Sequence, residues 1–172
     1  YVNTPSNKTI TLNLNGKTIN GTLSNWGTLN ISNGTIALNG DGWTLTNYST
    51  MNIYNLNVNY SKQNNGTALM NQGTMTMRGG TVYSGGNAFV NRSGRATIRN
   101  VTITGVTAHG VLSEGGSRSE FYNCNINRLC NGDSVGYGQV FVINTNVDYI
   151  YPNNPVVSIG RSGNSLAMAM YA

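Results

Sequence analysis

The sequence is poor in charge, in cysteine and in long apolar runs. Only 9% of its 172 residues are charged, against roughly a quarter in an average globular protein. No apolar run is long enough to span a bilayer, so we expect no membrane insertion. No signal peptide is recognisable and the chain starts at Tyr1, so we expect a processed chain or a piece of a longer one.

Carboxylates are scarce enough to restrict the possible chemistry. The five are Asp41, Glu114, Glu120, Asp133 and Asp148. Acid–base hydrolysis of a glycosidic bond needs two carboxyl groups close together, and the repeat register described below places no such pair. No cluster of acidic ligands suggests calcium or another metal, and no cofactor motif is present. We therefore expect a non-enzymatic protein without metal or cofactor.

One decapeptide pattern recurs six times along the chain. The copies are GTLNISNGTI, STMNIYNLNV, GTMTMRGGTV, GRATIRNVTI, SRSEFYNCNI and GQVFVINTNV. They start at residues 27, 49, 73, 94, 117 and 138, so successive starts are 22, 24, 21, 23 and 21 residues apart. A period of this length is typical of a solenoid, in which each repeat forms one coil.

Each repeat predicts two short strands on either side of a bend. The bend residue is Asn in five repeats and Gly in one, as a left-handed backbone conformation requires. Stacked asparagines in successive coils are also expected to bond to one another inside the coil as a ladder. The predicted ladder consists of Asn33, Asn55, Gly79, Asn100, Asn123 and Asn144.

A third strand is predicted between the repeats. Its expected members are 22–25, 44–47, 68–71 and 88–91, and 111–113 and 156–158 look like later ones. We see no segment with a helical period longer than a turn. Three strands in each coil of about 22 residues describe a parallel β-helix.

At this point the chain resembles the pectate-lyase-like right-handed β-helix superfamily, whose coils carry an asparagine ladder at a tight bend. The resemblance covers residues 8 to 150 and implies an all-β fold, a single-stranded right-handed parallel β-helix of six to seven coils. We expect one domain over residues 1–172, with a first coil and N-terminal edge at 1–26, regular coils at 27–150, and a terminal coil or assembly tail at 151–172. The resemblance implies little about activity, because enzymes, phage tailspikes and adhesins share the scaffold.

Enzyme signatures of that superfamily are incomplete in this chain. His109 lies in Ala-His-Gly, which resembles part of the Gly-His-Gly signature of polygalacturonase-type hydrolases, and Gly132-Asp133 resembles part of their paired-aspartate signature. In that family the aspartates precede the histidine, whereas here Asp133 follows His109. His109 is thus expected to be a loop residue.

The two cysteines leave the cellular compartment open. Cys124 occupies the position that Leu56 and Val101 occupy in other coils, which favours a small buried residue. A disulfide with Cys130 remains an alternative. The glycosylation sequons at Asn33 and Asn100 fall on predicted ladder positions inside the coil, which favours a bacterial or phage origin over a eukaryotic secretory one.

One outward column carries residues suited to binding. It reads Ser32, Tyr54, Arg78, Arg99, Tyr122 and Ile143, with Arg95 and Arg118 expected to stack next to it on the preceding strand. Aromatic faces stack on sugar rings and arginine forks pair with carboxylate or phosphate groups, and the net charge of +5 points the same way. The alternative is a solvated face in which arginines and tyrosines simply stack on each other.

These observations predict a structural or adhesive β-helix of a phage virion, such as a tail fibre or tailspike, or of a bacterial cell surface. Its expected location is extracellular, on a cell surface or on a virion. Expected partners are other copies or chains of a larger assembly, since solenoid ends expose unpaired strands, and cell-surface acidic glycans through Tyr54, Arg78, Arg95, Arg99, Arg118 and Tyr122. No nucleic acid is expected, because no recognition module is present. The alternative is a polysaccharide lyase or hydrolase whose active site is shared between subunits or lies outside this chain.

Overall fold

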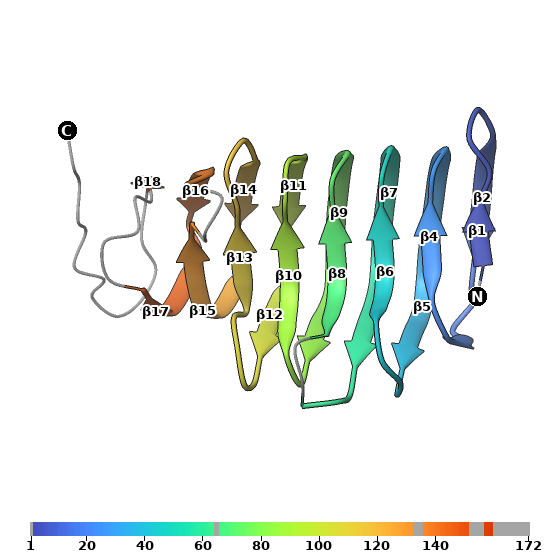
Figure 1. Cartoon of the computed structure of the whole chain (residues 1–172), viewed down its shortest axis with the longest axis horizontal. Coiled ribbons are helices and arrows are strands. Elements are labelled where there is room, and N and C mark those ends of the chain that lie inside the picture. The colour runs from blue at the N-terminus through green and yellow to red at the C-terminus, as the bar shows by residue number, and fades with distance from the viewer. Residues whose placement is uncertain (1, 64–65, 133–135, 152–156, 160–172) are drawn as a thin grey trace.

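The protein is a parallel β-solenoid of about seven coils. This computed structural model describes residues 2–63, 66–132, 136–151 and 157–159. Every strand-to-strand pairing is parallel, and no helix occurs in these ranges. Figure 1 shows the coils side by side along one axis, starting from the blue N-terminal coil. The predicted all-β architecture is confirmed.

The repeats form the first and second strands of each coil. After β2 (Thr9–Asn13) and β3 (Thr18–Asn20), three repeats run unbroken through the bend as β5 (Thr28–Leu38), β7 (Thr50–Tyr60) and β9 (Thr74–Ser84). Later repeats divide at the bend into β11 (Arg95–Arg99) and β12 (Thr102–Gly105), β14 (Arg118–Tyr122) and β15 (Asn125–Asn131), and β16 (Gln139–Ile143) and β17 (Asn146–Ile150).

The third strand of each coil lies on the face turned to the viewer in Figure 1. Its members are β1 (Val2–Thr4), β4 (Leu23–Asn25), β6 (Trp43–Asn47), β8 (Thr67–Asn71), β10 (Asn87–Asn91) and β13 (Val111–Ser113). The next member is the end of β15, since Leu129 pairs with Val111 and Asn131 with Ser113. The sequence pattern had not indicated this member, because β15 runs from the second-strand position into the third without a separating loop.

One predicted third strand belongs to a different column. β18 (Val157–Ile159) pairs with β16, with Val157 opposite Phe141 and Ser158 opposite Val142. It therefore continues the first-strand column. Residue 156 and the proposed assembly tail from 160 onward lie outside the described residues.

The core is a narrow column of aliphatic and aromatic side chains. Because successive residues of a strand point to opposite faces, alternate positions fill the interior. One inward column consists of Ile31, Ile53, Met77, Ile98, Phe121 and Val142, all buried. Cys124 is buried in the same core and Cys130 in a smaller cluster, and the two form no disulfide with each other in this structure.

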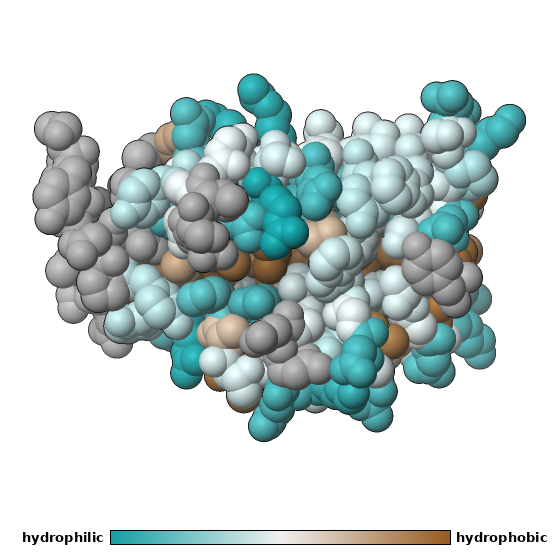
Figure 2. Space-filling model, viewed as in Figure 1, coloured by the Kyte–Doolittle hydropathy of each residue, from teal (hydrophilic) through white to brown (hydrophobic). Residues whose placement is uncertain are grey.

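That smaller cluster lies on the outer side of the third strand. Met70, Val90, Leu112 and Cys130 stack in register there, and Tyr48 and Tyr151 pack against them. Figure 2 shows brown, apolar residues along the middle of this face, between paler and more hydrophilic borders. Each of the four is at most 8% exposed, so flanking residues already cover most of this apolar seam.

The bend residues adopt the predicted left-handed backbone. Their φ angles are 57° at Asn33, 47° at Asn55, 71° at Gly79, 56° at Asn100, 52° at Asn123 and 48° at Asn144. The five asparagines are exposed, however, so the predicted position inside the coil is wrong. The bend turns their carboxamides outward, because the aliphatic residues on either side, such as Ile31 and Ile36, fill the interior.

A buried asparagine ladder exists at another corner, where the third strand ends. Asn25 Nδ2 donates to Asn47 Oδ1 at 2.8 Å, Asn47 to Asn71 at 2.8 Å, and Asn71 to Asn91 at 2.9 Å. All four side chains are completely buried and also bond to the backbone of the following turn. Asn91 Nδ2 in turn donates to Ser119 Oγ at 2.8 Å, which extends the ladder by one coil. The ladder therefore satisfies polar groups of the turns that would otherwise be buried without partners.

The ladder changes the argument about glycosylation sequons. Asn33 and Asn100 are exposed, so sugar there would not enter the core. Asn47, in Asn-Tyr-Ser, and Asn91, in Asn-Arg-Ser, are instead fully buried ladder members. Sugar on either residue is incompatible with this fold.

Candidate functional site

The binding face predicted from the sequence lies on the outer side of the first strand of each coil. Tyr54 pairs with Arg78, Arg78 with Arg99, and Arg99 with Tyr122 across β7, β9, β11 and β14. Neighbouring strands of a sheet lie about 4.8 Å apart, so the four side chains form a continuous row, here called the Tyr–Arg stripe. Arg95 pairs with Arg118 in a parallel row four residues earlier on the same strands, β11 and β14, and not on the preceding strand as the sequence predicted.

The two ends of the stripe differ in exposure. Tyr54 is 55% exposed and Arg78 is also exposed. Arg99 and Tyr122 are half-buried, because the Arg99 guanidinium lies over the Tyr122 ring with Cζ 3.7 Å from the ring centroid. This cation–π contact fixes both side chains. It also leaves Tyr54 and Arg78 as the more accessible half.

Glu120 sits between the two arginine rows. It pairs with Arg118 at 2.7 Å and accepts a hydrogen bond of 3.0 Å from the Tyr122 hydroxyl. Burial favours its neutral form, but the bonds from Arg118 and Tyr122 and the charges of Arg118 and Arg99 outweigh that effect and lower the pKa of Glu120. Arg118 also donates to Gln139 and lies over the Phe141 ring, so its guanidinium is largely engaged within the protein.

The face as a whole is electropositive. Four arginines, Arg78, Arg95, Arg99 and Arg118, share it with one carboxylate, that of Glu120. Among the described residues Arg78, Arg95 and Arg99 form no ion pair, while Arg118 does. Arg78 and Arg95 therefore carry charges that no ion pair offsets, and Arg99 interacts with the Glu120 carboxylate only at longer range, so the face keeps a net positive charge that attracts anions.

A groove of about 330 Å³ opens beside the exposed half of the stripe. Tyr54 and Arg78 line one side of it, and a row of polar side chains lines the other. In that row Thr76 Oγ1 donates to Asn52 Oδ1 at 2.8 Å, Asn52 Nδ2 to Asn30 Oδ1 at 2.9 Å, and Asn30 Nδ2 to Thr11 Oγ1 at 3.3 Å. The groove thus combines a polar row on one side with the Tyr54 ring on the other, is built on strands and is open to solvent. The sequence column already contained Tyr54 and Arg78, but nothing in it indicated the groove.

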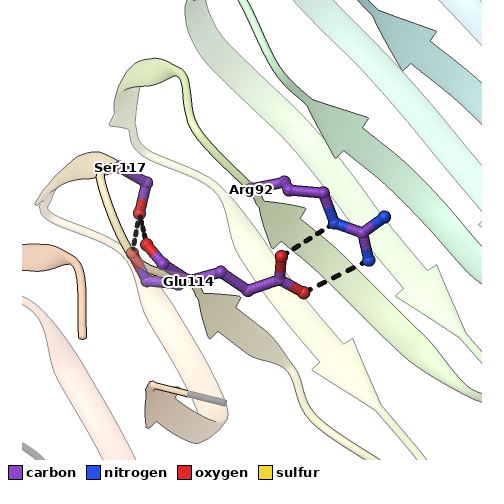
Figure 3. A network of polar contacts seen from close by, with 4 residues as sticks. Arg92, Glu114 and Ser117 are labelled. Atoms are coloured by element: carbon purple, nitrogen blue, oxygen red, sulfur yellow. Dashed lines mark hydrogen bonds and ion pairs between the residues drawn. The ribbon is translucent and has the colours of Figure 1, made fainter. Parts of the chain in front are cut away.

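The turn after the third strand carries a separate column of rings and charges. Trp26 stacks on Tyr48 with ring centroids 3.9 Å apart, and the column continues through Gln72 to Arg92. Arg92 binds Glu114 of the next coil through two contacts, Nε to Oε2 at 2.7 Å and Nη2 to Oε1 at 3.3 Å (Figure 3). The Glu114 side chain is only 3% exposed, and its backbone oxygen accepts a bond from Ser117. Glu114 is therefore a structural anchor of this corner.

The remaining titratable groups are dispersed. Asp41 pairs with Lys62 at the surface, Asp148 is exposed on β17, and Asp133 lies outside the described residues. His109 lies in the loop between β12 and β13, as predicted, with its ring 4.7 Å from that of Tyr151. No group of three His, Cys, Asp or Glu side chains suited to a metal ion occurs in the described ranges. In the same ranges no helix is long and apolar enough to cross a membrane.

Comparison with known proteins returned no relative. No family model matches the chain. No curated protein and no solved structure matches it either.

Proposed function

We propose that this protein is a non-enzymatic structural or adhesive β-helix that binds acidic glycans through the Tyr–Arg stripe and its flanking Arg95 and Arg118. It would work outside the cell, on a phage virion or a bacterial surface. Kinship with the pectate-lyase-like right-handed β-helices belongs to the same proposal. The similarity supporting it is the 22-residue coil with a left-handed bend, although here the buried ladder is at another corner.

The observation that carries the proposal is the row formed by Arg78 and Arg99, which make no ion pair among the described residues and are flanked by tyrosines. Guanidinium groups pair with carboxylate, sulfate or phosphate groups, and tyrosine rings pack against the apolar faces of sugars. Strands hold all of these side chains at fixed spacing, so little ordering is needed on binding. A linear polyanion lying along the solenoid would meet the same kind of residue at each coil.

Assembly with other chains is the second part of the proposal. At the N-terminal end β1, β2 and β3 each pair with only one described strand, and Val2 and Ile10 are exposed beside them. Unpaired parallel strands with exposed apolar side chains are suited to association with another coil. Such an arrangement would place many copies of the stripe on one particle, which raises the apparent affinity for a repetitive glycan.

Binding to immobilised acidic and neutral polysaccharides at several salt concentrations tests the proposal. We expect binding to the acidic polymers only, weakening steeply as salt rises because charges carry it. The chain length of the polysaccharide is measured in the same samples. Unchanged length with binding supports an adhesive role, whereas shortening of the polymer favours the lyase or hydrolase alternative. Equal binding to neutral polymers would contradict the role of the arginines.

A further inference from the structure

We infer that the groove beside Tyr54 is a subsite for a single carboxylate-bearing pyranose, with the carboxylate on Arg78, the sugar ring against Tyr54 and the hydroxyls on the Asn–Thr row. This inference rests on the proposed function and specifies where on the face the glycan binds. The ligand is a sugar acid, and its three contacts define a single orientation in the groove.

The size of the groove fits one or two sugar units. Its volume of about 330 Å³ lies at the small end of the range of ligand pockets. Tyr54 and Arg78 come from adjacent coils in direct register, so a ring packed on Tyr54 has its substituents within reach of Arg78. The 55% exposure of Tyr54 leaves ring surface available for that contact.

The polar row has hydrogen-bonding capacity left over. All three of its bonds run in one direction, from Thr76 through Asn52 and Asn30 to Thr11. Each carboxamide uses one of its two N–H donors in this chain, and Thr76 Oγ1, as a donor, keeps its lone pairs. The row therefore offers N–H donors along its length and an acceptor at the Thr76 end. Sugar hydroxyls, which both donate and accept, match that combination.

The position of Glu120 selects the end at which an anion binds. Arg118 is neutralised by Glu120, and Arg99 is held over Tyr122 close to the same carboxylate. An incoming carboxylate at that end would meet a like charge. Arg78 has no carboxylate partner among the described residues and lines the groove, so the attraction is greatest there.

Calorimetric titration with three tetrasaccharides tests the subsite. The first consists of uronic acid units, the second is the same chain with every carboxylate reduced to a primary alcohol, and the third is that neutral chain carrying sulfate groups. Four variants accompany the wild type: Arg78→Gln, Thr76→Val, Arg95→Gln and Thr102→Val. Arg95→Gln removes an equal charge from the same face outside the groove, and Thr102→Val serves as the matched threonine control.

For the uronic acid chain we expect Arg78→Gln to weaken binding by about tenfold or more, as loss of a charge-assisted pair does. Thr76→Val should weaken it by about fivefold, as loss of one hydrogen bond does. Arg95→Gln should weaken it clearly less than Arg78→Gln, because Arg95 lies on the charged face but outside the groove, and Thr102→Val by less than about twofold. If Arg78→Gln and Arg95→Gln weaken binding equally and Thr76→Val has no effect, the subsite is wrong but binding by the face as a whole stands. Sulfated chains that bind as tightly as the uronic acid chain would overturn the carboxylate assignment. Absence of binding by the wild type would remove both proposals.

Discussion

The guanidinium of Arg99 lies 3.7 Å above the ring of Tyr122 on the next coil. This contact uses one arginine and one tyrosine of the stripe to build a rigid surface, and it leaves Arg78 and Tyr54 to meet a ligand. Part of the stripe is therefore structural in the way that the solvated-face alternative requires. The other part is exposed and lies beside the groove with its row of Asn and Thr side chains.

Substitution of Asn71, a member of the buried ladder, should strongly reduce the stability of the protein. Its carboxamide accepts from Asn47 and donates to Asn91 and to the backbone, all without solvent. Asn71→Leu leaves several buried groups without partners, so we expect a loss of about 3 kcal/mol or more in the free energy of unfolding. Urea denaturation followed by circular dichroism measures this loss. A loss below about 1 kcal/mol, the net contribution of a single ordinary hydrogen bond, would contradict the ladder's role.

The bend asparagines should respond differently. Asn100 is exposed with φ of 56°, so its contribution comes from tolerating the left-handed backbone. We expect Asn100→Gly to be nearly neutral and Asn100→Leu to cost roughly 1–2 kcal/mol, the strain of a residue with a branched side chain in that conformation. The same urea titrations test both variants. Equal losses for Asn100→Gly and Asn100→Leu would show that the carboxamide itself matters at this bend.

The two classes of asparagine explain what the sequence could and could not predict. The 22-residue spacing of apolar residues such as Ile31, Ile53 and Met77 predicts the coils, because only stacking buries those side chains together. Asparagine recurs at two corners of the coil for two different reasons. At Asn55 it tolerates the left-handed backbone of the bend, and at Asn47 its carboxamide makes buried hydrogen bonds at the end of the third strand. The residue type by itself does not distinguish these two roles. The sequence did contain a pattern that marks the buried ladder, since Asn25, Asn47 and Asn71 each precede Gly or Ser by two residues.

Contacts between turns were harder to predict than the columns. Arg92 and Glu114 lie one period apart, but the burial of Glu114 depends on how the turns fold over it. The groove likewise depends on side-chain rotamers of Tyr54 and Arg78, which the repeat pattern does not specify. The register itself, from Tyr54 through Arg78 and Arg99 to Tyr122, agrees with the sequence column at every position.

The ion pair between Arg92 and Glu114 should contribute to stability. Arg92→Met leaves the Glu114 carboxylate buried without this cation, and we expect a loss of about 2 kcal/mol, less than for a fully buried pair because Arg92 is 49% exposed. The double variant Arg92→Met with Glu114→Met should regain most of this loss, since no unpaired charge remains. Thermal unfolding of both proteins measures the difference. A double variant less stable than Arg92→Met alone would contradict the explanation.

Glu120 should give the stability a defined pH dependence. Its pKa in the folded protein lies below the reference value of 4.5, so ionised Glu120 stabilises the fold above that value. The stabilisation should decline as pH falls through the lowered pKa. We expect Glu120→Gln to reduce the difference in unfolding free energy between pH 6 and acid solution, measured by urea titration at each pH. A wild-type slope retained in Glu120→Gln would assign the acid sensitivity to another group.

The buried sequons predict a failure in cells that glycosylate asparagine. Sugar attached to Asn47 or Asn91 before folding would block the ladder, so we expect secretion from such cells to yield little folded protein. The variant Ser49→Ala with Ser93→Ala abolishes both sequons and retains the asparagines. It should raise the yield of folded protein, as measured by size-exclusion chromatography. Folded wild-type protein that carries sugar at Asn47 or Asn91, detected by mass spectrometry, would contradict the buried ladder.

The most direct test of the central claim is the affinity of Arg78→Ser with Arg99→Ser for an acidic polysaccharide at low salt. Both side chains point outward, so the circular dichroism spectrum and unfolding midpoint should remain close to those of the wild type. The account predicts that the double variant loses most of its binding, because two of the three arginines of this face that form no ion pair among the described residues are gone. A folded double variant that binds as tightly as the wild type would contradict the account and reduce the Tyr–Arg stripe to a solvated face.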